Sequence, residues 1–368
     1  MIYNWQQKDW PHFQYSLTPV EDRLYEIAER MGRTNGMLMG VSNDLQSEAL
    51  VDMMVSEAIK TSEIEGEYLS RIDVMSSIRN NLGLNNEVLP VRDRRAKGIA
   101  ELMSAIRNKF SDDLSVEELF SWHSMLMKGD RIIKVGSWRD HEEPMQVISG
   151  PIGKEKVHYE APPSSMVASE MDAFIAWFNK TEPHAENAIK QGAIRSAIAH
   201  LYFETIHPFE DGNGRIGRAI SEKALSQGAG RPVLLSLSKI IEGNKRQYYD
   251  ALKEAQRSNE ITAWLEYFVD VVLQAQIYAE EQIGFILKKT KFFDRHKDKL
   301  NARQSLVLQK MLEAGVEGID QRMTAKKYIK IAKTTKPTAT RDLQDLVEKG
   351  AFMPQGEGRS RGYLIVLS

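Results

Sequence analysis

Residues 207–218 read HPFEDGNGRIGR and form the most informative stretch of this 368-residue chain. The two glycines that flank Asn213 predict a loop that leads into a helix beginning near Gly214. The first turn of a helix has backbone N–H groups without intrahelical partners, and the helix dipole adds partial positive charge there. Such a loop favours a bound anion, although a glycine-rich turn capped by the Asn213 side chain explains the glycines equally well.

Two arginines and an aspartate in the same stretch favour a phosphate ligand over a simple turn. Arg215 and Arg218 are three residues apart, so both project from one side of the first helical turns. Guanidinium groups bind phosphate oxygens, and cations at a helix N-terminus oppose the dipole unless an anion compensates them. Asp211 is typical of an Mg²⁺ ligand shared with a nucleotide, with a helix N-cap as the alternative. Together these residues predict a site for a nucleoside di- or triphosphate.

His207 is the candidate general base of this site. Pro208 disfavours helical geometry at the residue before it. An unperturbed imidazole titrates near pH ~6.5 and can accept a hydroxyl proton at neutral pH. His200 lies on the preceding apolar segment and is better explained as a packed side chain, and Glu210 is expected to point outward.

The whole stretch resembles the signature of the Fic family, HxFx(D/E)GNGRxxR. Every fixed position of the signature is present, namely His207, Phe209, Asp211, Gly212, Asn213, Gly214, Arg215 and Arg218. The resemblance implies an all-α fold in which a helical Fic core carries a short β-hairpin flap. It also implies a protein adenylyltransferase that moves AMP from ATP to a Ser, Thr or Tyr hydroxyl of a target protein and of itself.

The resemblance implies a role for each motif residue. His207 takes the proton of the attacking hydroxyl, Asp211 holds Mg²⁺, and Phe209 anchors the loop in the core. Arg215 and Arg218 bind the β- and γ-phosphates, in keeping with the need of phosphoryl transfer for positioning and charge neutralisation. The full set of expected nucleotide contacts comprises Val147, Ile148, Ser149, Gly150, Asp211, Gly212, Asn213, Gly214, Arg215, Ile216, Gly217, Arg218, Tyr248 and Gln256, the last two from a loose match.

The segment 145–157 matches the family's flap. It combines β-branched residues with two glycines and a proline, which predicts a hairpin. By resemblance, a target protein docks along this flap by strand addition. Gly214 stands where Doc-type kinases have lysine, which favours AMP transfer over phosphate transfer, whereas phosphocholine-transferring relatives stay open.

Residues 61–66, TSEIEG, resemble the (S/T)xxxE(G/N) inhibitory motif of Fic proteins that carry their own N-terminal regulatory helix. Thr61 and Glu65 fall on one helical face, and Gly66 suits a helix C-terminus. A carboxylate in the last helical turn is unfavourable with the dipole, so Glu65 gains from a nearby cation. We expect it to pair with Arg218 and block the γ-phosphate site. A solvated surface glutamate is the alternative.

Composition places few further limits on function. The chain has no cysteine, so disulfides and thiolate chemistry are excluded. It lacks an apolar run long enough for a membrane span and a secretory leader pattern, from which we expect a cytoplasmic protein without a membrane partner. Helical periodicity predicts helices over 45–62, 94–109, 115–128, 165–180, 186–204, 214–227, 242–257 and 260–287. We expect domains at 1–90, with an inhibitory helix near 45–66, at 91–287 for the Fic core and at 288–368.

The last 81 residues carry 18 Lys and Arg against 9 Asp and Glu, so the remainder of the chain is acidic. Three predicted helices (301–314, 324–332 and 338–349) and a hairpin resemble a winged helix-turn-helix, with Thr338 to Glu348 as recognition helix and 355–362 as wing. Its partner is DNA or protein, and a homodimer is expected. Two other functions stay open, namely a transcription regulator whose Fic core senses nucleotide and an enzyme that removes AMP.

Overall fold

The computed structural model describes residues 2–129, 132–149, 156–313, 315, 322–356 and 361–367, without the side chains of Ser149 and Lys156. Contacts divide the chain into two compact units. The first comprises Met1–Arg33 and Leu50–Ala279, and the second comprises Thr34–Ala49 and Glu280–Ser368. The division falls within three helices, and the expected three-domain organisation stays a prediction.

The first unit is built mainly of helices around two apolar cores. Its elements are two 3₁₀ turns (η1, Asn4–Gln6; η2, Thr18–Val20), α1 (Glu21–Met39), α2 (Asn43–Ile64), α3 (Arg71–Asn81), α4 (Arg94–Asn108), α5 (Val116–Leu126), β1 (Gln146–Ser149), β2 (Lys156–Glu160), α6 (Ser164–Lys180), α7 (Gly192–Ile206), α8 (Asn213–Ala229), α9 (Leu237–Gly243), α10 (Lys245–Ala255) and α11 (Thr262–His296), with α1, α2 and α11 continuing into the second unit. The fold is therefore mostly α, as the sequence predicts.

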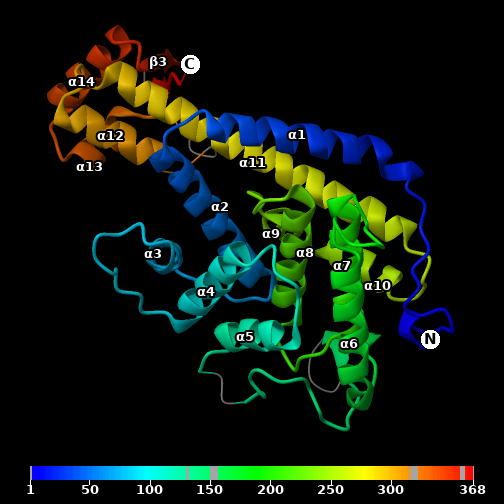
Figure 1. Cartoon of the computed structure of the whole chain (residues 1–368). Helices are drawn as coiled ribbons and strands as arrows, with labels where there is room; N and C mark the ends of the chain where they lie inside the picture. Colours follow the sequence, from blue (N-terminus) through cyan, green and yellow to red (C-terminus); the bar gives the residue numbers. More distant parts are fainter. Residues whose placement is uncertain are drawn as a thin grey trace. The chain divides into compact units, whose positions relative to one another are not determined.

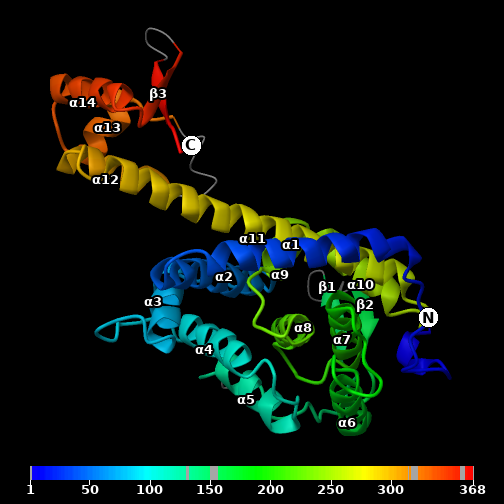
Figure 2. The ribbon, with the colours of Figure 1, turned by 45° about the horizontal axis from the view of Figure 1, so that its top comes forward.

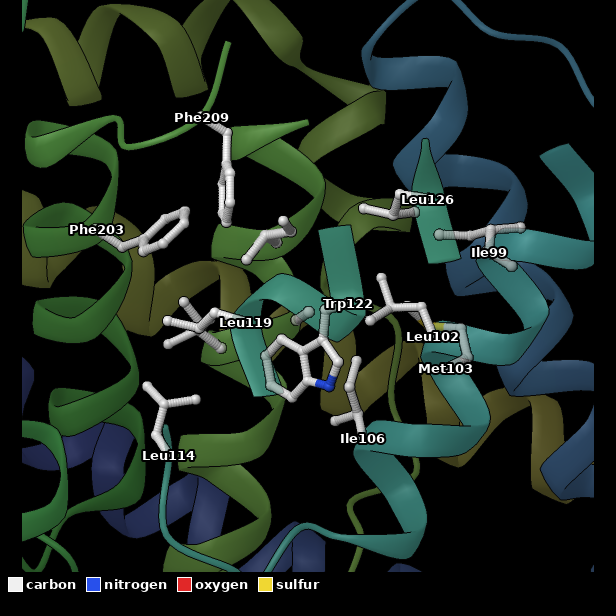
Figure 3. Packing of buried hydrophobic residues seen from close by; sticks show 14 of the residues in the cluster. Ile99, Leu102, Met103, Ile106, Leu114, Leu119, Trp122, Leu126, Phe203 and Phe209 are labelled. Carbon is white, nitrogen blue, oxygen red and sulfur yellow. The ribbon is translucent and has the colours of Figure 1, made fainter. Parts of the chain in front are cut away.

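Helices α7 and α8 run side by side in both views (Figures 1 and 2), and the signature occupies the loop between them and the start of α8. Four apolar residues of α8 are buried, namely Ile216, Ala219, Ile220 and Ala224. Phe209, in the loop between the two helices, packs toward Phe203 and toward Trp122 and Leu119 of α5 (Figure 3). This aromatic and aliphatic packing fixes the loop because close-packed interiors admit few alternative arrangements.

The hairpin predicted at 145–157 is present in its described part. Strands β1 and β2 are antiparallel, with Gln146 opposite Glu160 and a register irregularity between Val147 and Ile148. The hairpin is tied to α7 because the hydroxyl of buried Tyr159 donates to the carbonyl of Thr205 at 2.5 Å. The flap region is therefore anchored beside the last turn of the helix that precedes His207.

The second unit contains α12 (Ala302–Leu312), α13 (Ala325–Ala332), α14 (Lys336–Glu348) and an antiparallel hairpin of β3 (Phe352–Gln355) and β4 (Gly362–Ile365). One apolar cluster that includes Leu308, Tyr328, Leu343 and Phe352 joins these elements. Asp342 is buried between them, where it accepts hydrogen bonds from Arg303 and from the Tyr328 hydroxyl.

Several helices differ from the sequence predictions. Helix α7 begins only at Gly192 because the polar residues before it form turns closed by local bonds such as Ala185 N to Glu182 O. Helix α11 extends to His296 rather than ending near 287. The predictions missed α1, α3 and α9, although Ser70 and Asp73 carry a capping signal for α3, where the Ser70 hydroxyl accepts from the Asp73 amide. None of the helices in the described parts of the chain is long and apolar enough to cross a membrane.

Candidate functional site

His207 lies at the end of α7 in a backbone conformation that non-glycine residues rarely adopt. Its φ is +51°, and its amide donates to the carbonyl of Phe203 at 2.9 Å. This left-handed conformation ends the helix and turns the chain into the signature loop. The imidazole is mostly buried, with 15% of the side chain exposed.

Arg139 holds this strained turn in place. Its buried guanidinium donates to the carbonyls of His207 at 2.8 Å, of Ile206 at 3.2 Å and of Pro162 at 2.6 Å. Burial lowers the pKa of Arg139 to about 10, so the group stays protonated at neutral pH. The carbonyls at the end of α7, which have no intrahelical partners, thus receive a cationic donor.

His123 on α5 contacts the signature loop at Phe209 and Asp211. Its ring stacks on Phe209 with centroids 4.1 Å apart, and its Nδ1 accepts from the amide of Gly136. Since Nδ1 accepts, Nε2 carries the proton and donates to the carbonyl of Asp211 at 3.2 Å. Burial lowers the pKa of His123, which keeps this ring neutral.

The side chain of Asn213 shapes the loop rather than capping the helix. Its Oδ1 accepts from the amide of Phe209 at 2.9 Å, and its Nδ2 donates to the Phe209 carbonyl at 2.8 Å. Gly212, at φ +83°, takes the N-cap position of α8, and no side chain caps the helix. Both capping alternatives, Asn213 and Asp211, are therefore wrong, and the first N–H groups of α8 stay available to an anion.

Both signature arginines are buried and paired with carboxylates that follow α2. Arg218 Nη2 donates to Glu65 Oε1 at 2.7 Å, and its Nε donates to the Thr61 hydroxyl at 2.7 Å. Arg215 Nη1 donates to Glu67 Oε1 at 3.1 Å. The ion pair that the sequence predicts between Glu65 and Arg218 is present.

Glu65 stabilises the positive charge of the buried Arg218 guanidinium. Burial alone would lower the pKa of Arg218, but the charge of Glu65 and its hydrogen bond outweigh this effect and raise it. Gly214 admits the pair, because a Cβ at this position would lie 2.4 Å from Glu65 Oε1. The Glu65 carboxylate therefore lies directly against the first turn of α8.

A cavity of about 640 Å³ opens beside these residues. Of the predicted site residues it is lined by Glu65, Val147, Ile148, His207, Asp211, Gly212, Asn213, Gly214, Tyr248 and Gln256. Arg215, Ile216, Gly217 and Arg218 lie behind this lining, with the Ile216 side chain in the core. Gly150 lies outside the described residues. One cavity is thus lined by His207, by the uncapped N-terminus of α8 and by Glu65, the carboxylate that binds Arg218.

Two family models match parts of the chain. Residues 113–225 match the Fic/DOC family, and residues 3–84 match a domain of unknown function, DUF4172. Residues 113–225, which carry the signature, are thus similar to the Fic/DOC family. The Fic match covers α5 to most of α8, and so includes His123, the hairpin and the complete signature.

Several curated relatives of this chain carry the name protein adenylyltransferase. The chain is 30% identical over 164 residues to the probable protein adenylyltransferase aq_aa38 of Aquifex aeolicus, covering 44% of this chain and 43% of the relative. It is 22% identical over 241 residues to the protein adenylyltransferase fic-1 of Caenorhabditis elegans, covering 62% of this chain and 43% of that one. The chain thus spans less than half the length of these relatives.

Solved structures of Fic proteins have a similar fold. A Fic family protein from Desulfovibrio desulfuricans G20 matches 97% of this chain and 98% of its own, with a TM-score of 0.56 and 19% identity. A Fic domain containing signaling protein from Bacteroides thetaiotaomicron matches 71% of this chain with a TM-score of 0.53. At these identities the likeness concerns the fold alone.

Two of the predicted site residues, Tyr248 and Gln256, line the cavity and also form hydrogen bonds within the protein. Tyr248 is buried, and its hydroxyl lies 2.8 Å from His200 Nε2, while His200 Nδ1 lies 3.1 Å from the hydroxyl of Ser221. Gln256 Nε2 donates to the carbonyl of Glu204 at 3.1 Å. His200 is thus a packed, hydrogen-bonded residue, as expected.

Sequence reasoning missed four residues that shape the Fic site, namely Glu67, His123, Arg139 and Glu204. Glu204 had a detectable signal, since it is a carboxylate in an otherwise apolar helix one turn before His207. Arg139 and His123 had none, because only the tertiary fold brings them to the loop. Among the described residues no group of three or more His, Asp or Glu forms a metal-binding cluster.

Proposed function

We propose that this chain is a protein adenylyltransferase that transfers AMP from ATP to a hydroxyl of a target protein and of itself. The observation that carries the proposal is the convergence at one cavity of His207, the uncapped N-terminus of α8 and Glu65, the carboxylate that binds Arg218. The names of the curated relatives support the same activity.

In the proposed reaction His207 accepts the proton of the target hydroxyl. The hydroxyl oxygen then forms a bond to the α-phosphorus of ATP, and the bond to the bridging oxygen breaks so that pyrophosphate leaves with the electron pair. The N–H groups of Asn213 and Gly214 face the phosphates at the start of α8. Tyr248 and Gln256 line the cavity on the side proposed for adenine.

Asp211 suits the proposed Mg²⁺. Its side chain is 60% exposed and lies at the cavity, and Mg²⁺ in nucleotide sites takes one or two carboxylates together with phosphate oxygens. Mg²⁺ would neutralise phosphate charge there. A single protein carboxylate agrees with the lack of a larger acidic cluster among the described residues.

Glu65 is proposed to restrain the enzyme. While the Glu65 carboxylate accepts from Nη2 of Arg218, that donor is not available to the γ-phosphate. Glu67 occupies Arg215 in a similar way. The resting chain is therefore expected to bind ATP in an unproductive pose and to label itself slowly.

The β1–β2 hairpin is proposed to receive the target segment. Ile148 and Val157 are exposed apolar residues on it, and Val147 and Ile148 also line the cavity. A target strand added to this hairpin would bring its hydroxyl toward His207.

Labelled ATP and Mg²⁺ test the proposal directly. Wild-type protein should incorporate label slowly, the Glu65→Gly variant should do so faster, and His207→Ala should show none. A search of cell lysate for proteins that gain the mass of AMP would identify the target. Label retained by a folded His207→Ala protein would refute the proposed base, and release of AMP from a modified target would favour the alternative of AMP removal.

A DNA-binding function of the second unit is a second candidate. Its three helices and hairpin support a winged-helix assignment, and α14 exposes Lys336, Thr340, Arg341 and Gln344 on one side. The proposal predicts DNA binding that weakens steeply with salt and is lost in Arg341→Ala but kept in His207→Ala. Protein contacts through the same unit, a homodimer and a cytoplasmic location stay predictions.

A further inference from the structure

Glu204 is a buried carboxylate in the last turn of α7, one turn before His207. Its side chain is 5% exposed, and its Oε2 lies 3.5 Å from His207 Nδ1. Neither Glu204 Oε1 nor His207 Nδ1 has a hydrogen-bond partner among the described residues. Burial and the negative end of the helix dipole both oppose a charge at this position, so its presence requires a compensating group.

The fold makes room for this carboxylate. Position 217 on α8 is glycine, and a Cβ there would lie 2.5 Å from Glu204 Oε1. A larger residue at 217 would displace the carboxylate from the space between α7 and α8. The space therefore accommodates the Glu204 carboxylate where it faces the imidazole of His207.

His207 is the side chain that is best placed to compensate Glu204. Burial alone would raise the pKa of Glu204, but the interaction with the His207 imidazole 3.5 Å away outweighs this effect, together with His200 and Arg218, and lowers it. His200 also faces the carboxylate, yet burial lowers its pKa and its ring nitrogens already meet Ser221 and Tyr248. Arg218 faces it too, but is bonded to Glu65 and Thr61.

We propose that Glu204 is a positioning residue for His207. The Glu204 carboxylate accepts a hydrogen bond from Nδ1–H of the imidazole. This leaves Nε2, on the cavity side, with a free lone pair. When Nε2 takes the hydroxyl proton, the carboxylate stabilises the imidazolium that forms. A contact of 3.5 Å closes to a hydrogen bond with a small side-chain rotation, and such bonds commonly shorten in the reacting complex. This inference rests on the proposed role of His207 as base.

The first experiment reads the imidazole without any need for activity. ¹⁵N NMR of protein labelled at histidine, with His207→Gln to assign the signal, reports which ring nitrogen carries the proton. We expect a protonated Nδ1 in neutral His207 of the wild type and a shift toward the Nε2-protonated form in Glu204→Met. A wild-type ring protonated on Nε2 would overturn the inference whatever the protein catalyses.

The second experiment reads the reaction in the Glu65→Gly background. Glu204→Gln should lower kcat for self-labelling about 10- to 100-fold, leave KM for ATP within about twofold and move the acid limb of the pH profile to lower pH. The control is Glu118→Gln, which changes another buried carboxylate, one that pairs with Lys223 on α8. Equal kcat and an unchanged pH profile in a folded Glu204→Gln protein would also overturn the inference. Absence of label in the parent would instead count against the proposed function.

Discussion

Replacing Glu65 by glycine should release the proposed restraint and raise the rate of self-labelling by about 30-fold. The Glu65–Arg218 contact is a single charge-assisted hydrogen bond of 2.7 Å, and the Glu65 side chain is 28% exposed. Hydrogen bonds to charged groups contribute about 1.5–3 kcal/mol, and partial exposure places this one near about 2 kcal/mol. Since about 1.4 kcal/mol corresponds to a factor of ten, the restrained form outweighs the released form by about 30 to 1.

The assay measures initial incorporation of labelled AMP at saturating ATP. Glu65→Gln, which keeps an acceptor but loses the charge, should give a smaller increase than Glu65→Gly. Glu63→Gln is the matched control, because Glu63 lies in the last turn of α2, two residues before Glu65, but pairs with Lys60 and is absent from the cavity lining. A rise of less than about threefold in a folded Glu65→Gly protein, or an equal rise in the control, would refute the reasoning.

The Glu65→Gly change should also make the free energy of unfolding depend more strongly on bound ATP. Without Glu65, Arg218 loses its charge partner and keeps only its bonds to Thr61. We expect a loss of about 2 kcal/mol in the free energy of unfolding, largely restored when nucleotide phosphates compensate the guanidinium. Thermal unfolding with and without Mg²⁺-ATP measures both effects. A variant that ATP stabilises no more than the wild type would contradict a phosphate site at Arg218.

Three further substitutions test the contacts of Glu65 and Arg215 and the protonation of Glu222. Gly214→Ala should destabilise the wild type by about 1–3 kcal/mol but the Glu65→Gly background by less, because the added Cβ meets Glu65 Oε1; equal losses in chemical denaturation would exclude this clash. Glu67→Gln removes the charge partner of Arg215, so self-labelling should rise a few-fold in this variant and further when the change is combined with Glu65→Gly. Burial, with the nearby charge of Glu57, raises the pKa of Glu222 from 4.5 to about 8, so the folded chain keeps a proton that the unfolded chain releases. Stability should therefore fall as pH rises between these values, by up to about 5 kcal/mol at about 1.4 kcal/mol per unit, and Glu222→Gln should remove this slope in denaturation measured across pH.

Much of the fold was accessible from the sequence because its helices are regular and amphipathic. The spacing of apolar residues over α4, α6 and α8 identified these helices to within a few residues. Helices α1 and α9 were not predicted, because only a few of their residues are buried. The packing of those residues depends on the other helices that share the core with them. The start of α7 was misplaced for a related reason, because local hydrogen bonds outweighed helix formation in a polar segment.

The signature and the inhibitory motif could be recognised in the sequence because each is local. Residues 207–218 lie on one loop and one helix start, so their spacing alone implies a phosphate site and a base. The pairing of Glu65 with Arg218 was also predictable from an unfavourable anion and an unfavourable cation at opposite helix ends.

Only the tertiary structure decided how this site is supported and how firmly it is held. His123 of α5 and Arg139 of the segment before β1 contact the loop from distant parts of the chain, and no local pattern signals that they meet there. Glycines 214 and 217 admit carboxylates whose positions depend on how α2 and α7 pack against α8. Sequence spacing determines contacts within one helix or loop, because the backbone geometry there is regular. Contacts between elements depend on packing in three dimensions, and in this protein those contacts orient the base and cover the arginines.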